Sequence, residues 1–309
     1  MKRNFIKFAV LGLCIIAITN TTKAQRQNNI PEKGSSSIGI VINPISGIRA
    51  NGMFKAGDFI GNAIQAQAAS PYQMFILADP LISLRYKYKM SNTTSFRGSI
   101  GFSGAKFNYK EYIQDDIAAL DAAMDGEFTA AQVEDIIHFK MSGGGLNLGL
   151  EFGGNAGNFR FTGGFGLVYS FGGGSTSFTY GNQMTSDNLY QPTIMPIIDS
   201  LKMSGFYKDI NLAGARPVKR YPSGVEHAFG LSLDLGLEWY FAKNISIGAT
   251  VSLVPFIYAI QPETYIESEG YSPVEDAVMK VKKKISSGSN YLLYGTENIG
   301  LQLSFNYYF

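Results

Sequence analysis

The sequence predicts an all-β protein, a transmembrane antiparallel up-and-down β-barrel, and three observations support this prediction. From Phe229 to Phe241, apolar residues alternate with small or polar ones over thirteen positions, the period of a strand with one apolar face. The chain has 35 glycines, 22 phenylalanines and 18 tyrosines but only 16% charged residues. The last residues alternate in the same way up to Phe309. Strands of this composition suit a wall that faces lipid on one side.

The first 24 residues read as a secretory signal peptide. Lys2, Arg3 and Lys7 precede an apolar run over 8–18, and small residues follow at 22–24. The apolar run is about half of the ~20 residues that a membrane-spanning helix needs. We therefore expect a signal peptide over 1–24 and a short periplasmic N-terminal tail over 25–35.

Charge and cysteine usage exclude several function classes. The whole chain carries +2, and removing the four basic residues of the signal leaves 22 − 24 = −2. Such a chain has no basic excess for binding nucleic acid. Cys14, the only cysteine, lies inside the signal, so the mature chain is expected to have no disulfide and no thiolate metal site.

The first three strands are predicted over 36–48, 74–90 and 93–110. Their apolar sets recur at every second position, and a tight turn at 91–92 joins the second to the third. We take these sets as lipid-facing: Ile38, Ile40, Ile42; Ile82, Leu84, Tyr86, Tyr88; Phe96, Ile100, Phe102.

Five further strands are predicted over 138–153, 158–180, 225–242, 244–261 and 290–309. Short turns at 154–157 and 242–244 alternate with long extracellular loops at 49–73, 111–137, 181–224 and 262–289. Alternating short and long links are typical of bacterial barrels, in which the short turns are periplasmic. Eight strands result, with ten as the alternative if 192–198 and 201–212 form one more hairpin.

The terminal run resembles the signal by which the barrel-assembly machinery recognises outer-membrane proteins. Its residues are Leu301, Leu303, Phe305, Tyr307 and Phe309. With the signal peptide and the eight segments, it resembles the small outer-membrane barrels of the OmpA and OmpX type and the PorT-like barrels, without a periplasmic peptidoglycan-binding domain. The resemblance implies a multi-pass barrel in the bacterial outer membrane, both termini periplasmic, with lipid, lipopolysaccharide and the assembly machinery as partners.

The register also predicts a charged interior. Four cations and three acids fall on the faces opposite the apolar sets: Arg85, Lys87, Arg97, Arg160, Glu151, Asp234 and Glu238. An eight-stranded wall leaves room only for its own side chains. We expect these groups to pair across the barrel and close it.

Two loops have distinctive charge. The loop 111–137 carries eight acids and no lysine or arginine. Ile113, Ile117, Leu120 and Met124 recur at helical spacing, and Thr129 with Gln132 forms a capping-box pattern, which predicts two short helices. Four lysines at 280 and 282–284 could bind lipopolysaccharide phosphates or belong to a solvated hairpin.

The sequence contains no convincing catalytic constellation. His138 and His227, the only histidines, fall at the outer ends of strands with no recognisable nucleophile motif near them. We predict no enzyme activity, no cofactor and no metal site. The chain is expected to be a closed scaffold whose extracellular loops bind a partner, in adhesion or as a subunit of an outer-membrane complex. A narrow pore for small or lipophilic solutes is the first alternative, and a lipid-modifying enzyme at the outer rim is the second.

Overall fold

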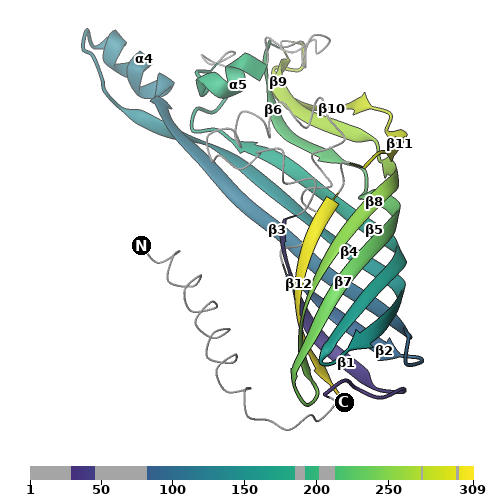
Figure 1. Cartoon of the computed structure of the whole chain (residues 1–309). Coiled ribbons are helices and arrows are strands. Elements are labelled where there is room, and N and C mark those ends of the chain that lie inside the picture. The colour runs from purple at the N-terminus through teal and green to yellow at the C-terminus, as the bar shows by residue number, and fades with distance from the viewer. Residues whose placement is uncertain (1–28, 46–81, 185–191, 202–212, 273, 297–298) are drawn as a thin grey trace.

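A computed structural model describes residues 29–45, 82–184, 192–201, 213–272, 274–296 and 299–309 (Figure 1). These ranges contain twelve strands and two short helices. The strands are β1 (Ser36–Ile45), β2 (Ile82–Lys89), β3 (Thr94–Gln114), β4 (Gln132–Ala156), β5 (Phe159–Thr179), β6 (Ala213–Pro222), β7 (Glu226–Ala242), β8 (Ile245–Gln261), β9 (Thr264–Ser272), β10 (Ala277–Ser286), β11 (Ser289–Tyr294) and β12 (Ile299–Tyr308). The helices are α4 (Asp116–Met124) and α5 (Pro196–Leu201).

The strand pairings are all antiparallel, and eight of the strands pair in a closed cycle. β1 pairs with β2, β2 with β3, β3 with β4, β4 with β5, β5 with β7, β7 with β8, β8 with β12, and β12 with β1. The prediction of an all-β antiparallel fold is confirmed. The predicted count of eight or ten strands is not, because the described residues contain twelve.

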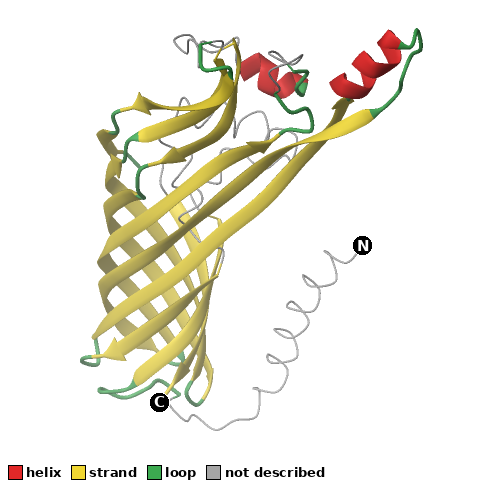
Figure 2. Cartoon of the chain, turned by 180° about the vertical axis from the view of Figure 1, so that it is seen from behind, coloured by secondary structure: helices red, strands yellow, loops and turns green. Residues whose placement is uncertain are grey.

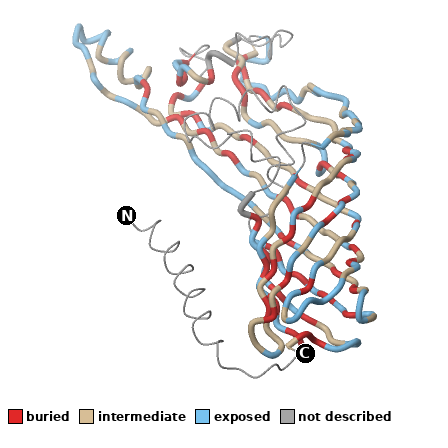
Figure 3. Tube along the Cα trace, viewed as in Figure 1, coloured by how far each residue is buried: buried red, intermediate tan, exposed pale blue. Residues whose placement is uncertain are grey.

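Within this cycle, side chains alternate between a buried and an exposed face (Figure 3). On β7, Leu235 is 71% exposed, whereas Asp234 beside it is 4% exposed. Across the seams, exposed apolar residues stand opposite one another, as Ile40 does with Leu84 and with Phe305. The outward face is therefore a continuous apolar belt, and the polar residues point inward.

Two turns at one end of the cycle have two residues each. Ala156 pairs with Phe159, and Ala242 pairs with Ile245. Gly157 and Asn244, within these turns, adopt positive φ of 60° and 66°, the left-handed conformation that tight hairpins require and that glycine and asparagine tolerate best. The turn predicted over 154–157 is thus corrected to 157–158, because pairing continues through Ala156.

At the opposite end, β3 and β4 continue as a long hairpin past their neighbours (Figures 1 and 2). Their pairing runs without a break to Gln114 and Gln132, so both ends of the predicted loop 111–137, at 111–114 and 132–137, are strand. Only one of its two predicted helices forms, which is α4. The predicted second helix is wrong: the Thr129 hydroxyl accepts a hydrogen bond from the backbone N–H of Ala131, and Gln132 already belongs to β4.

At the same end the sheet continues beyond β5: β6 pairs with β5 and β9, and β9 pairs with β10. The predicted loops 181–224 and 262–289 therefore contain α5 and β6, and β9 and β10. The predicted last strand divides into β11 and β12, both of which pair with β8. The possible extra hairpin does not form over 192–198, where α5 begins, and residues 202–212 lie outside the described part.

A small apolar core holds this end together. Its members come from β3, β4 and the segment that follows β5: Ile113, Ile137, Phe139, Tyr180, Ile194, Met195 and Ile198. Some predicted features cannot be compared, since the signal peptide 1–24, the loop 49–73 and residues 74–81 lie outside the described ranges. None of the described helices is long and apolar enough to cross a membrane.

Candidate functional site

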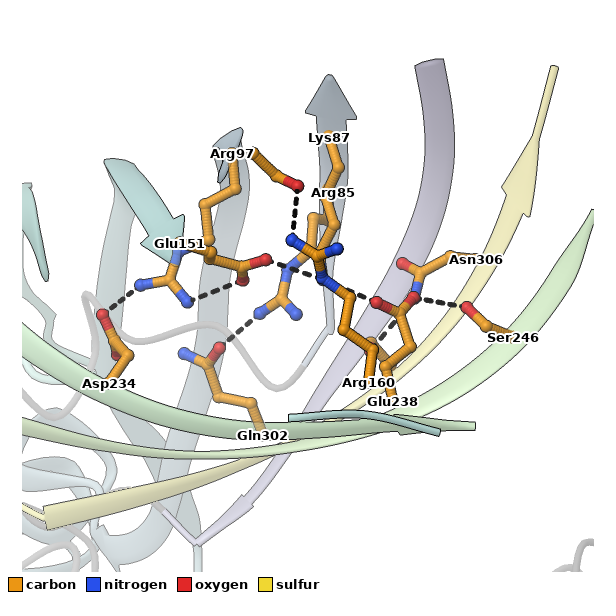
Figure 4. A network of polar contacts seen from close by, with 12 residues as sticks. Arg85, Lys87, Arg97, Glu151, Arg160, Asp234, Glu238, Ser246, Gln302 and Asn306 are labelled. Carbon is orange, nitrogen blue, oxygen red and sulfur yellow. Dashed lines mark hydrogen bonds and ion pairs between the residues drawn. The ribbon is translucent and has the colours of Figure 1, made fainter. Parts of the chain in front are cut away.

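The interior of the cycle carries a network of charged side chains (Figure 4). The alternation described above turns every second side chain of β2, β3, β4 and β7 inward. All seven predicted interior residues are buried, with 6% exposure or less: Arg85, Lys87, Arg97, Glu151, Arg160, Asp234 and Glu238. Buried charges are stable only when they are paired or hydrogen-bonded.

Glu151 is the centre of the ion pairs. Its carboxylate lies 3.2 Å from Lys87 Nζ and 3.3 Å from Arg97 Nη1. Lys87 also contacts Glu238, at 3.3 Å, and Arg97 also pairs with Asp234. Because β7 is not a neighbour of β2 or β3 in the cycle, these two contacts cross the interior.

The two remaining arginines bond differently. Arg85 donates to the side-chain oxygen of Gln302, which joins β2 to β12. Arg160 donates to the backbone carbonyl oxygens of Asn92 and Thr93, at 3.0 and 3.1 Å. Of the seven predicted residues, five therefore form one chain of ion pairs, while Arg160 ties the turn between β2 and β3 to β5.

Several partners of the network were not predicted. Glu238 accepts hydrogen bonds from Tyr308 at 2.9 Å, from Asn306 at 3.0 Å and from Tyr240 at 3.1 Å, and also from Ser246. Asn306 and Tyr240 occupy polar-register positions of their strands, which was the available signal. For Tyr240, the register indicated the inward face but not that its hydroxyl would bond to Glu238.

The N-terminal segment packs against the short-turn end. Ile30 forms an apolar cluster with Tyr240 and Tyr308. The backbone oxygen of the buried Pro31 accepts a hydrogen bond from Lys89, which is itself buried. These contacts join the described residues of the predicted periplasmic tail to the interior network.

At the other end, hydrogen bonds tie the segment after β5 to the β3–β4 hairpin. The buried Asn182 side chain accepts from the backbone N–H of Asp116 at 3.0 Å and donates to the carbonyl oxygens of Gln114 and Thr193, at 2.8 and 3.1 Å. Buried backbone N–H and C=O groups need hydrogen-bond partners, and the Asn182 side chain supplies one to each of these three groups. The loop at this end is therefore folded against the hairpin.

Two buried charges reinforce the structure at this end. Asp135 accepts from the backbone N–H groups of Gly181 and Met195, both at 2.9 Å. Burial raises the pKa of Asp135, and the two hydrogen bonds oppose that shift. The Arg216 guanidinium lies 3.9 Å from the ring centroid of Tyr180, within the range of a cation–π interaction.

The far end of the β3–β4 hairpin is unlike the rest of the outer structure. Asp115 caps α4 by accepting from the N–H groups of Ile117 and Ala118, as acidic N-caps do. No residue of α4 is buried. Large apolar side chains are exposed on the helix and beside it: Ile117, Leu120, Met124 and Phe128. We call these four residues, with Asp121, Asp125 and Glu127, the α4 tip.

The histidines make ordinary polar contacts. His138 bonds to Asn108 through Nδ1 and to Thr179 through Nε2, at 3.0 and 3.1 Å. His227 lies 2.8 Å from the hydroxyl of Tyr169 and stacks on its ring.

The acids closest in sequence to these histidines bond to other groups. Glu134 pairs with Lys110 at 2.8 Å, and Glu226 accepts from Tyr291 at 2.8 Å. Within the described ranges, these contacts give no acid–histidine pair of the kind that hydrolases use.

Comparisons with known proteins gave no sequence-based match and several similar solved structures. No protein-family model and no curated protein matches the chain. The crystal structure of the outer membrane protein OprG from Pseudomonas aeruginosa is similar, with 11% identity, a TM-score of 0.34, and coverage of 92% of this chain and 99% of that one. Ail, the attachment invasion locus protein of Yersinia pestis, has 13% identity, a TM-score of 0.32, and coverage of 90% and 99%. A major outer membrane protein from Thermus thermophilus has 10% identity, a TM-score of 0.37, and coverage of 89% and 99%.

Proposed function

We propose that this chain is an integral outer-membrane β-barrel protein, a closed scaffold that binds a partner through the α4 tip. The membrane location is inferred from the apolar belt. Exposed leucine, isoleucine and phenylalanine residues stand outside the cycle on every strand that forms it. A water-soluble surface rarely carries so large a contiguous apolar area, whereas a transmembrane barrel requires it. In this proposal the eight paired strands form the membrane wall, and the extended ends of β3 and β4, with β6, β9, β10 and the helices, lie outside it.

The closed interior is inferred from the ion pairs that cross it. Arg97 on β3 contacts Asp234 on β7, and Lys87 on β2 contacts Glu238 on β7. A pore for solutes, the runner-up, would need a path past these contacts. Their mixed signs favour a structural network over a channel lining of one polarity.

The observation that carries partner binding is the exposed α4 tip. The outer structure buries its own apolar core around Met195 and Ile198, yet it leaves Met124 and Phe128 in solvent, Phe128 completely. Exposed apolar groups within a polar rim are typical of protein-binding surfaces. The rim here is acidic only, since residues 111–137 contain no lysine or arginine.

Site-specific photo-cross-linking tests this function. A photo-reactive residue in place of Met124 should give a discrete adduct on intact cells. Met90, an exposed methionine beside the turn between β2 and β3 at the opposite end, is the matched control and should give no such adduct. If Met124 yields no adduct, or the same adduct as Met90, the tip is not the binding surface.

A further inference from the structure

A second surface at the outer end complements the α4 tip. β10 is the last strand of its sheet and pairs only with β9 among the described residues. Its residues Val278, Met279 and Val281 are exposed, and the strand carries four lysines and no acid. We call Val278, Met279 and Val281, with Lys280, Lys282 and Lys283, the β10 edge.

Internal contacts hold the β10 edge in place. Lys284 pairs with Glu263, and the Lys282 amine lies 4.3 Å from the ring centroid of Tyr265. β10 is paired with β9 over almost its whole length. The exposed Lys280 and Lys282 therefore belong to an ordered strand, so binding through this strand costs less conformational entropy than binding through a mobile loop.

The two surfaces lie on opposite sides of the outer end. Figures 1 and 2, which differ by a half-turn, both place α4 and β10 far apart, with the β3–β4 hairpin leaning away from the cycle. They cannot meet within one molecule. In the proposed membrane location, all copies share one orientation, so the α4 tip of one copy and the β10 edge of its neighbour lie on the same side of the membrane.

We propose that the partner of the α4 tip is the β10 edge of a second copy of this chain. Both surfaces expose apolar side chains, and their charges are opposite: Asp121, Asp125 and Glu127 face the lysines of β10. Contacts between two tips or between two β10 edges would place like charges together, which is unfavourable. The contact is therefore head-to-tail, and it builds rings or rows of copies rather than two-fold dimers.

This inference rests on the proposed function, and the cross-link at Met124 distinguishes failure of the inference from failure of the proposed function. An adduct of twice the chain mass, with the cross-link in residues 277–286, is the expected result. An adduct with a different protein would overturn self-association and leave tip binding intact. Absence of any adduct would overturn both.

Charge exchange provides an independent test on the same cross-link. Reversing the tip (Asp121→Lys, Asp125→Lys, Glu127→Lys) or the edge (Lys280→Glu, Lys282→Glu, Lys283→Glu) should each reduce the two-copy adduct at least about tenfold. Both reversals in one chain should restore it. Lys243→Glu, in the exposed turn between β7 and β8, is the control and should have no effect.

One outcome identifies a different ligand for the lysines. If reversing the edge removes the adduct but the combined reversal does not restore it, the lysines serve another acidic ligand, such as lipopolysaccharide phosphate. That result would overturn the head-to-tail contact.

Discussion

At the scale of single residues, Glu151 is the group on which the interior depends most. Its two oxygens pair with Lys87 and Arg97 at 3.2 and 3.3 Å, and its side chain is 4% exposed. Removing one partner of a buried ion pair leaves an uncompensated charge, which costs more than the pair itself contributes. Substituting Glu151 would therefore leave both Lys87 and Arg97 without the carboxylate that they share.

Glu151→Gln should therefore destabilise the protein by ~3–5 kcal/mol and lower its unfolding midpoint in detergent. The variant keeps the size of the side chain, so a cavity does not explain the loss. Lys243→Gln, a charge change in an exposed turn, should move the midpoint little. Equal midpoints for Glu151→Gln and the parent chain would show that the network does not stabilise the fold.

At the scale of elements, the outer end is an ordered structure with its own supports. Asn182 links three backbone groups from β3, the start of α4 and the segment before α5. Ile194, Met195 and Ile198 then pack on β3 and β4. These contacts support the β3–β4 hairpin that carries the α4 tip.

Asn182→Ala should loosen this end without unfolding the wall. Leaving buried backbone groups without partners costs ~1–3 kcal/mol each, so amide hydrogens around Met195 and Ile198 should exchange at least about tenfold faster. Gln183→Ala is the neighbouring control, because Gln183 is exposed and its side chain donates to the carbonyl of Tyr180 rather than to the hairpin. Equal exchange in the two variants would contradict the role given to Asn182.

The sequence was most informative where the period of two was unbroken. Alternation in Leu233–Leu237 assigns each side chain to a face, because a strand turns successive side chains to opposite sides. It could not show that β3 and β4 continue to Gln114 and Gln132. The acidic residues near those strand ends are typical of a solvent-exposed loop. The apolar core that includes Met195 and Ile198 depends on contacts between segments distant in sequence. The interior contacts of Glu151 and Glu238 likewise join strands that are far apart in the chain, so alternation alone does not predict which charges pair.

At the scale of the whole molecule, the interior and the outside have opposite character. Charged residues from β2, β3, β4, β5 and β7 meet inside, while apolar residues form the outer belt. A closed network predicts that purified protein in planar bilayers shows no steady conductance of porin size. Large, steady currents whose ion selectivity changes in Glu151→Gln would favour the narrow-pore alternative.

Spin-label accessibility tests most directly whether the apolar belt is embedded in the membrane. Cys14, the only cysteine of the chain, lies in the predicted signal peptide. One cysteine introduced at Leu235 in the belt, or at Val274 in the outer structure, therefore gives a single label in the mature chain. In lipid bilayers, the label at Leu235 should collide often with oxygen and rarely with a water-soluble nickel chelate. The label at Val274, which is 91% exposed, should show the reverse. Chelate collisions at Leu235 as frequent as those at Val274 would contradict a lipid-facing wall.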